Sequence, residues 1–193
     1  PRDYTQNKHH KVDDIPYGGG PGMVMMVDPI MRAWEDARKR DLKNKAVNFL
    51  KTGKITGNKK YKTIILSPGG VEFNTDYAKQ TALEYTDLIF ICGRYEGIDT
   101  RVAHIIGNEA EEVSIGNYVL TGGELATMVM MDSISRQIDG VLGNKHSLEE
   151  DRISSHEMYT RPAAYVYKGK TYTVPEVLQS GNHALIDEWR KNH

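Results

Sequence analysis

The sequence has 193 residues, the size of one ordinary domain with a small appendage. Hydrophobic residues make up 39% and charged residues 26%, which excludes a disordered chain, and no apolar run is long enough to cross a membrane. The formal net charge is −1 and the single cysteine is Cys92, so an internal disulfide is excluded and we expect a cytoplasmic protein with no membrane partner.

One stretch carries much more positive charge than the rest of the chain. Between Arg32 and Lys62 there are eleven Lys or Arg residues and three acidic ones. A run of this kind is usually a solvated helix face followed by a basic loop, and we favour that interpretation on charge alone. A contact surface for a polyanion is the alternative.

The first part of the chain predicts a loop, a helix and a strand. Three adjacent glycines make residues 17–22 a loop. Asp28 and Pro29 are typical of an N-cap and a first helical turn, so we expect a helix to about residue 49 and a second loop over 53–60. Residues 62–66 predict a short buried strand that runs into a turn at 67–70.

The elements that follow repeat one order of strand, glycine-bearing loop and helix. We expect a helix over 75–85, where Tyr77, Thr81 and Tyr85 are four residues apart, and a buried strand over 88–92 that ends at Gly93. A short helix over 98–106, a turn bracketed by 111–113 and 118–120, and a long helix from 123 to about 139 follow. This order predicts an α/β fold, with a parallel sheet and helices on both faces, that binds ligands beyond the carboxyl ends of its strands.

The character of the sequence changes near Gly143. Residues 144–158 are polar and rich in acidic side chains, which predicts an interdomain linker. Residues 161–172 predict an extended segment with a turn at 168–170, and residues 175–178 and 184–189 predict two small helices. We therefore divide the chain into a first domain over 1–143, a linker over 144–158 and the start of a small C-terminal helical domain over 159–193.

Several common kinds of site are missing from the sequence. It has no phosphate-binding P-loop, no Cys/His cluster with zinc spacing, so no metal site is expected, and no G-x-S-x-G nucleophile elbow. What remains is a set of five glycines, at 93, 97, 116, 122 and 123, in the two loops that follow strands. Any one of them more often just closes a tight turn, but together they favour a ligand pocket made largely by main-chain groups.

A series of motifs resembles the bacterial tRNA (guanine-N(1))-methyltransferases, which belong to the trefoil-knotted (SPOUT) methyltransferases. The motifs occur in the family's order and span almost the whole chain. They are VDD at 12–14, YGGGPGM at 17–23, LSP at 66–68, CGRYEGID at 92–99, and the segments 114–125, 140–143, 149–151, 159–162 and 174–190.

The resemblance implies a fold with a deep trefoil knot, in which the loops at Gly93 and 114–123 enclose S-adenosyl-L-methionine as methyl donor. It makes 1–143 the knotted catalytic domain and 159–193 the start of a tRNA-binding domain. For Glu96, the residues alone leave helix capping as an alternative role. The donor-binding residues implied by position are Leu66, Ser67, Pro68, Gly93, Tyr95, Glu96, Gly97, Ser114, Ile115, Gly116, Asn117, Tyr118, Val119, Leu120, Gly122 and Gly123.

The resemblance also implies the reaction, which is methylation of N(1) of the guanosine at tRNA position 37, just 3′ to the anticodon. Asp151 matches the family's general base, which removes the N(1) proton, and Arg136 matches the arginine that stabilises charge on guanine O6. Taken without the family, Asp151 is a solvated residue in an acidic run. Arg136 could likewise pair with Asp132 on a helix surface.

The family's enzymes are homodimers with composite sites, which implies that Asp151 acts on the donor site of the other subunit. The family pattern also places a strand and helix before residue 1 and more of the helical domain after residue 193, so we expect a longer chain. The spacing over 152–158 is a few residues shorter than the pattern. The residues that the resemblance implies for RNA binding are Asp13, Gly20, Ser147, Tyr159 and Arg161.

Two other functions stay open from the residues. The chain could be a related knotted RNA methyltransferase with a different target nucleotide. It could also be a non-catalytic RNA-binding protein on the same scaffold, which predicts RNA retention without affinity for the donor.

Overall fold

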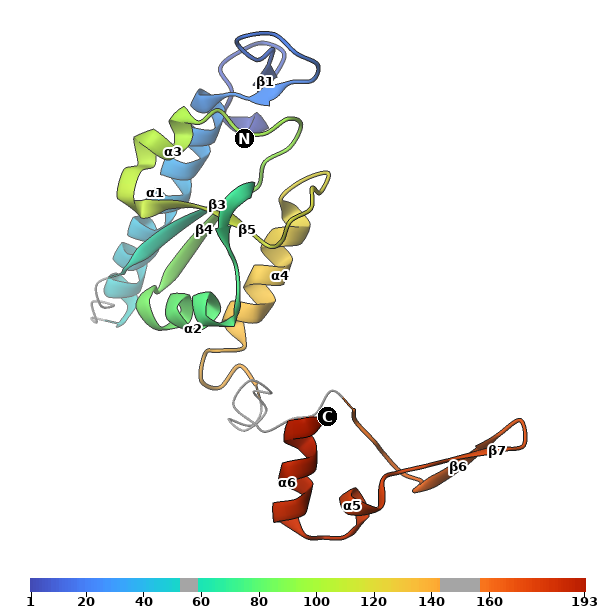
Figure 1. The fold of residues 1–193 in the computed structure, drawn as a ribbon. Helices are drawn as coiled ribbons and strands as arrows, with labels where there is room; N and C mark the ends of the chain where they lie inside the picture. Colours follow the sequence, from blue (N-terminus) through green and yellow to red (C-terminus); the bar gives the residue numbers. More distant parts are fainter. Residues whose placement is uncertain (53–58, 143–156) are drawn as a thin grey trace. The chain divides into compact units, whose positions relative to one another are not determined.

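The computed structural model describes residues 1–52, 59–142 and 157–193, and these form two compact units, Pro1–Val141 and Leu142–His193 (Figure 1). The predicted linker, 144–158, falls almost entirely outside the described residues, as do Ser147 and Asp151. Within the described part of the chain, no helix is both long and apolar enough to span a membrane.

The first unit is built on a three-stranded parallel sheet in the order β4-β3-β5. The strands are β3 (Tyr61–Glu72), β4 (Asp87–Ile91) and β5 (Ala110–Ser114). Central strand β3 is buried over Thr63, Ile64 and Ile65, a β-branched run that fits a strand covered on both faces. The predicted α/β fold with a parallel sheet is confirmed.

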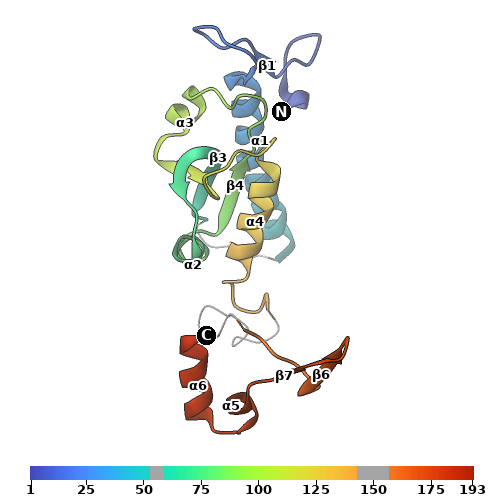
Figure 2. The same ribbon diagram turned by 45° about the vertical axis from the view of Figure 1, so that its right-hand side comes forward.

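Helices cover both faces of this sheet, as predicted (Figures 1 and 2). Side chains alternate along a strand, so Ile65 points to one face and Ile64 to the other. Ile65 packs with residues of α1 (Val27–Thr52) and α3 (Arg101–Ile106), including Ile30 and Val102. Ile64 packs with α2 (Thr75–Glu84) and α4 (Glu124–Ser135), against Ala78, Met130 and Ile134.

Strand β3 is longer than the predicted 62–66 because it bulges instead of ending. Val113 of β5 pairs with both Leu66 and Val71, so residues 67–70 bulge out of the ladder between two paired stretches. Pro68 has no N–H to donate to a ladder, which favours a bulge at this point. Gly70 approaches β5 so closely that an added Cβ would lie 2.4 Å from the carbonyl carbon of Glu112.

Helix boundaries also differ from the prediction at capping residues. Helix α1 begins at Val27, so Asp28 lies in its first turn and accepts a hydrogen bond from Nε of Arg32 at 2.9 Å instead of capping it. Helix α3 begins at Arg101, three residues after the predicted start, and the Asp99 carboxylate accepts from the Arg101 backbone N–H at 3.0 Å. Helix α4 ends at Ser135, four residues before the predicted end.

Polar side-chain contacts join the sheet of the first unit to its helices. The indole N–H of Trp34 donates to the hydroxyl of Thr63 at 2.9 Å, and Thr63 is only 1% exposed. At the amino-terminal edge of the sheet, Glu111 accepts from the Tyr77 hydroxyl at 2.7 Å and pairs with the Lys62 ammonium at 2.5 Å. Burial raises the pKa of the Glu111 carboxyl, but these two hydrogen bonds outweigh it and leave the pKa below its ordinary value.

Short irregular pieces complete the first unit. The 3-10 turns η1 (Arg2–Tyr4) and η2 (Gly107–Glu109) are single turns. Strands β1 (Asp13–Asp14) and β2 (Val24–Met25) form a small antiparallel pair that the sequence did not predict. The glycine loop between them is present as predicted, and Gly18, Gly19 and Gly20 all have positive φ.

The second unit has the predicted extended segment, turn and two helices. Strands β6 (Ala164–Tyr167) and β7 (Lys170–Thr173) form an antiparallel hairpin. Its two-residue turn has positive φ at both Lys168 and Gly169, which matches the right-handed twist of a hairpin. Helices α5 (Glu176–Gln179) and α6 (His183–Asn192) follow, and Ile186 of α6 is buried.

Candidate functional site

The two glycine loops of the sequence meet beyond the carboxyl ends of β4 and β5. Gly123 donates its backbone N–H to the carbonyl of Gly93 at 3.0 Å, and Arg94 forms an isolated antiparallel bridge with Gly122. The carboxyl ends of parallel strands lie at one edge of a sheet, which brings together loops about thirty residues apart in sequence.

A segment much earlier in the chain braces the first of these loops. The backbone N–H of Met25 donates to the carbonyl of Gly97 at 2.9 Å, and the N–H of Glu96 donates to the carbonyl of Met23 at 3.0 Å. Met25 also forms a parallel bridge with Ile98. Three separate stretches of chain are therefore held together by main-chain hydrogen bonds at this edge.

These loops and the β3 bulge enclose a cavity of about 310 Å³, within the usual size range of small-molecule sites. All but one of the sixteen predicted ligand-site residues line it. The exception is Asn117, which is exposed at the tip of the loop. The structure thus gathers segments 66–68, 93–97 and 114–123 around one space; the glycine pattern indicated the last two, and the motif resemblance added the first.

The cavity also has lining residues that the sequence prediction missed. Arg94 and Thr121 lie inside the two glycine loops, and Val113 directly precedes the second. Ala126 lies three residues after Gly123, on the same face of α4 by helical periodicity. That periodicity is the signal that could have found Ala126.

The close approach of the loops depends on particular glycines. Gly116 has φ +151°, and a Cβ there would lie 2.4 Å from Cε1 of Tyr118. At Gly123 a Cβ would lie 2.9 Å from the Cα of Cys92 and 3.0 Å from the Cβ of Leu66. At Gly123 the second loop therefore comes closer to the first loop than a residue with a side chain would allow.

Charged side chains stand at the rim of the cavity. Nε of Arg94 donates to Glu124 at 2.8 Å, which joins the first loop to the start of α4. The backbone N–H of Glu124, with a further hydrogen bond from Arg94, lowers the pKa of the Glu124 carboxyl. Glu96 lines the cavity with its side chain against Gly22, and it does not cap α3, whose N-cap position is Thr100.

The structure does not bring Arg136 into this cavity. Arg136 is the C-cap of α4, whereas the cavity lies at the N-terminal end of that 12-residue helix, about 18 Å away along its axis. No ion pair joins Arg136 to Asp132 among the described residues, and its Nε is buried there without a hydrogen-bond partner. Asp151 lies outside the described residues.

The residues predicted to bind RNA are spread over both units. Asp13 lies half-buried in β1, and Gly20 lies in the exposed glycine loop with φ +116°. In the second unit, Tyr159 packs beside Trp189 with ring centroids 6.2 Å apart, and Arg161 is exposed. Ser147 lies outside the described residues.

The basic stretch over 32–62 is largely neutralised where its side chains are described. Each of its six described cations forms an ion pair, as expected for a solvated helix face. The side chains of the Lys and Arg residues between 40 and 54 are not among those described. The six ion pairs are Arg32–Asp28, Arg38–Glu109, Lys39–Glu35, Lys59–Asp87, Lys60–Glu84 and Lys62–Glu111.

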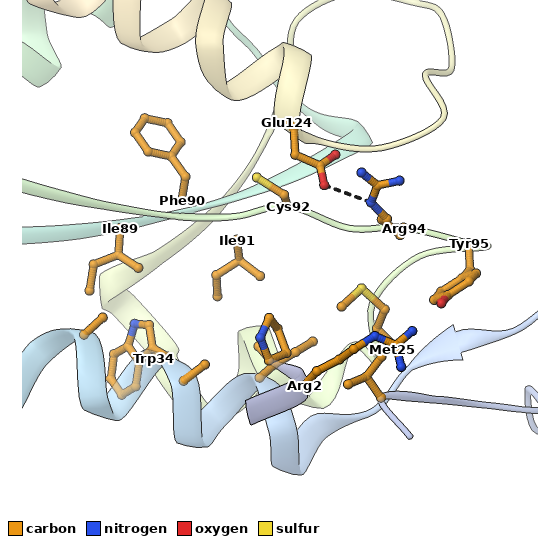
Figure 3. Close-up of a pocket in the computed structure, with 15 residues that line it drawn as sticks. Arg2, Met25, Trp34, Ile89, Phe90, Ile91, Cys92, Arg94, Tyr95 and Glu124 are labelled. Atoms are coloured by element: carbon orange, nitrogen blue, oxygen red, sulfur yellow. Dashed lines mark hydrogen bonds and ion pairs between the residues drawn. The ribbon is translucent and has the colours of Figure 1, made fainter. Parts of the chain in front are cut away.

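A second cavity, of about 420 Å³, is lined by residues of β4 and α1 (Figure 3). Ile89 and Ile91 point from β4 toward Trp34 of α1, so the walls are mainly apolar (Figure 3). It is the larger space, but it lacks the converging main-chain groups of the first. Among the described residues, no group of three or more His, Cys, Asp or Glu side chains could hold a metal ion.

Comparison with known proteins gives consistent matches over the whole chain. The family model described as tRNA (Guanine-1)-methyltransferase TrmD matches residues 1–193. A protein named tRNA (guanine-N(1)-)-methyltransferase from Carboxydothermus hydrogenoformans is 45% identical over 98% of this chain and 66% of its own length. Proteins with the same name from Latilactobacillus sakei and Clostridium botulinum are 44% and 45% identical over 98% of this chain, and 69% and 70% of their own lengths. The chain therefore spans about two thirds of the length of these relatives.

Proposed function

This chain belongs to the tRNA (guanine-1)-methyltransferase family, as its motifs indicated, and on that premise we propose that it transfers a methyl group from S-adenosyl-L-methionine to N(1) of a guanosine in tRNA. The observation that carries the proposal is the cavity between the two glycine loops, where fifteen of the sixteen residues implied for the donor come together. We infer position 37, 3′ to the anticodon, as the target from the motif resemblance.

The cavity suits a bent adenosine-containing ligand. Leu66 and Ile115 offer apolar contacts, while the loop backbone offers donors and acceptors for the adenine edge and ribose. The bound donor supplies an electrophilic methyl group on a sulfonium, whose charge is neutralised on transfer. Ser114, whose hydroxyl donates to the carbonyl of Gly116 at 3.0 Å, holds the second loop in the shape that forms the wall.

We infer that the loops around the cavity form a trefoil knot. Two observations support the knot. The hydrogen bond between Gly123 and Gly93 joins the first glycine loop to a later segment of the chain, and the bridge from Met25 to Ile98 joins the end of that loop to an earlier segment. A knot would hold both loops against the donor without any side-chain support.

The proposed chemistry needs a base and a cation near the guanine. N(1) of guanosine carries a proton and is a poor nucleophile until that proton leaves, and the Asp151 carboxylate accepts it. A free aspartate has a pKa of about 3.9, so it is a weak base for this step. Arg136 offsets that weakness by donating hydrogen bonds to O6 as negative charge develops there.

The position of Arg136 makes a homodimer part of the proposal. In its own chain it is a helix length away from the cavity, so it can act only on a site that another copy brings to it. Helix α4 offers a surface for that copy, because Leu125, Met128 and Met131 are 60%, 65% and 54% exposed. Asp151, from the segment that follows, would then serve the same partner site.

The tRNA substrate would contact both units. We assign this role to Asp13, Gly20, Ser147, Tyr159 and Arg161, by position in the motifs. The segment 159–193 would be the start of a tRNA-binding domain, joined to the catalytic domain by the linker over 144–158. An exposed Arg161 and the aromatic pair of Tyr159 and Trp189 suit phosphate and base contacts.

The test is methyl transfer to unmodified tRNA followed by mapping of the modified nucleotide. Asp151→Ala and Arg136→Gln should each lower the rate by roughly 10²-fold or more, with binding of S-adenosylhomocysteine unchanged. Glu150→Gln, next to the base in the same acidic run, is the matched control and should stay active. Methylation at another nucleotide would favour a related RNA methyltransferase, and no donor binding would favour an RNA-binding protein.

A further inference from the structure

The hairpin of the second unit has an aromatic face. Cross-strand partners in an antiparallel pair lie on the same face, and so do residues two apart along a strand. Tyr165 is paired with Tyr172, and Tyr167 with Lys170. Three tyrosines and a lysine therefore share one face, which we call the tyrosine face, and its members are Tyr165, Tyr167, Lys170 and Tyr172.

The tyrosine face is uncovered within the second unit. Tyr165, Tyr167 and Tyr172 are 60%, 54% and 50% exposed, and all eight strand residues of the hairpin are exposed. A two-stranded hairpin with no covering layer is only marginally stable, so three large exposed rings are not explained by folding. They indicate a surface that another molecule covers.

The charge around the tyrosine face favours an anionic partner. Residues 158–175 contain Arg161, Lys168 and Lys170 and no acidic residue. The ammonium of Lys168 lies 5.4 Å from the ring centroid of Tyr167, and that of Lys170 lies 5.1 Å from the centroid of Tyr172. Among the described residues neither lysine forms an ion pair, so both charges are available to phosphates.

We propose that the tyrosine face is a stacking platform for unpaired bases of the RNA substrate, with Lys168 and Lys170 contacting the adjoining phosphates. Aromatic rings in a positively charged surface bind single-stranded RNA because every base has a face that can stack. The Cα atoms of Tyr165 and Tyr167 are about 6.7 Å apart along the strand, so each ring can meet a different base. This inference rests on the proposed function for its RNA substrate.

The experiment measures the affinity of the full-length protein for a labelled tRNA transcript by fluorescence anisotropy. The variant Tyr165→Thr/Tyr167→Thr/Tyr172→Thr removes the rings but keeps residues that favour strands. It should weaken RNA binding by about tenfold or more, the effect of losing at least one stacked base. The variant with phenylalanine at all three positions should bind as the unchanged protein does.

A matched control lies on the opposite face of the same hairpin. Ala164→Thr/Val166→Thr changes two exposed strand residues without touching a ring, and should leave RNA affinity unchanged. Lys168→Gln/Lys170→Gln should reduce the slope of log affinity against log salt by about 1.4, since each phosphate contact on a single strand contributes about 0.7. Equal RNA affinity of the threonine variant, or equal weakening by the control pair, would overturn the proposal.

Two further readouts separate this inference from its alternatives. Loss of self-association in the threonine variant, by sedimentation, with RNA affinity intact would mean that the tyrosine face covers a second copy instead. If RNA binding depends on the tyrosine face but the methyl group goes to no guanosine N(1), the proposed function fails and the platform stands. If guanosine is methylated and the threonine variant binds RNA normally, the platform fails and the function stands.

Discussion

Gly123 is the position where one added methyl group would test the architecture of the cavity most directly. It joins the second glycine loop to α4, and its backbone N–H bonds to Gly93. Its φ of −76° is open to any residue, so Gly123→Ala introduces no backbone strain. The new Cβ meets atoms that cannot rotate away: the Cα of Cys92 at 2.9 Å, the Cβ of Leu66 at 3.0 Å and the N of Gly93 at 3.2 Å.

The expected cost follows from these contacts. Overpacking against groups that cannot rotate away costs about 1–3 kcal/mol, and replacing glycine by alanine returns about 0.4–1 kcal/mol by restricting the unfolded chain. The net loss should be about 1 kcal/mol, or a fall in Tm of about 4 °C for a unit of this size. Because α4 must move away from the first loop, affinity for S-adenosylhomocysteine should also fall, by about tenfold.

Thermal unfolding and calorimetry measure the two effects separately. Gly69→Ala is the matched control, because an added Cβ there meets nothing within 4 Å and Gly69 does not line the cavity. It should be neutral or slightly stabilising and should bind the donor analogue normally. If Gly123→Ala unfolds at the same temperature as the unchanged protein, close approach of the two loops is not what requires glycine.

Three other substitutions test the packing of the first unit. In Glu111→Gln the Tm should fall less steeply as the pH is lowered. A carboxyl whose pKa is lowered by folding stabilises the folded state at pH values above its ordinary pKa of 4.5, and this contribution is lost as the pH falls through the pKa of the folded state. Identical profiles of Tm against pH for the variant and the unchanged protein would contradict this. Thr63→Val should lower the free energy of unfolding in urea by about 1–3 kcal/mol, because it leaves the Trp34 indole N–H unpaired. The double variant Thr63→Val/Trp34→Phe should lose less than the sum of the two single losses. If the two losses simply add, the hydrogen bond does not stabilise the fold. Asn74→Ala should lower the free energy of unfolding by about 1 kcal/mol, because it removes the N-cap of α2, whereas Asn74→Asp should keep the stability. Equal urea midpoints for the two variants would refute the capping role.

Much of the fold was readable from local patterns in the sequence. The apolar run at 88–92 and the four-residue spacing within 75–85 predicted β4 and α2 almost to the residue, because strand burial and helical periodicity are properties of short segments. The glycine clusters after the strands marked the edge where the cavity lies, since several glycines together in loops at one sheet edge favour a pocket made by main-chain groups.

The tertiary structure decided what depends on strand order, register and chain contacts over long distances. Residues 67–70 looked like a turn, but β5 pairs on both sides of them and makes them a bulge in one long strand. Arg136 belongs to the same helix as the cavity-lining Ala126 yet lies at its far end, which no motif indicates. The tyrosines of the hairpin share a face only because their strands pair in one register, and pairing energy between distant residues sets that register.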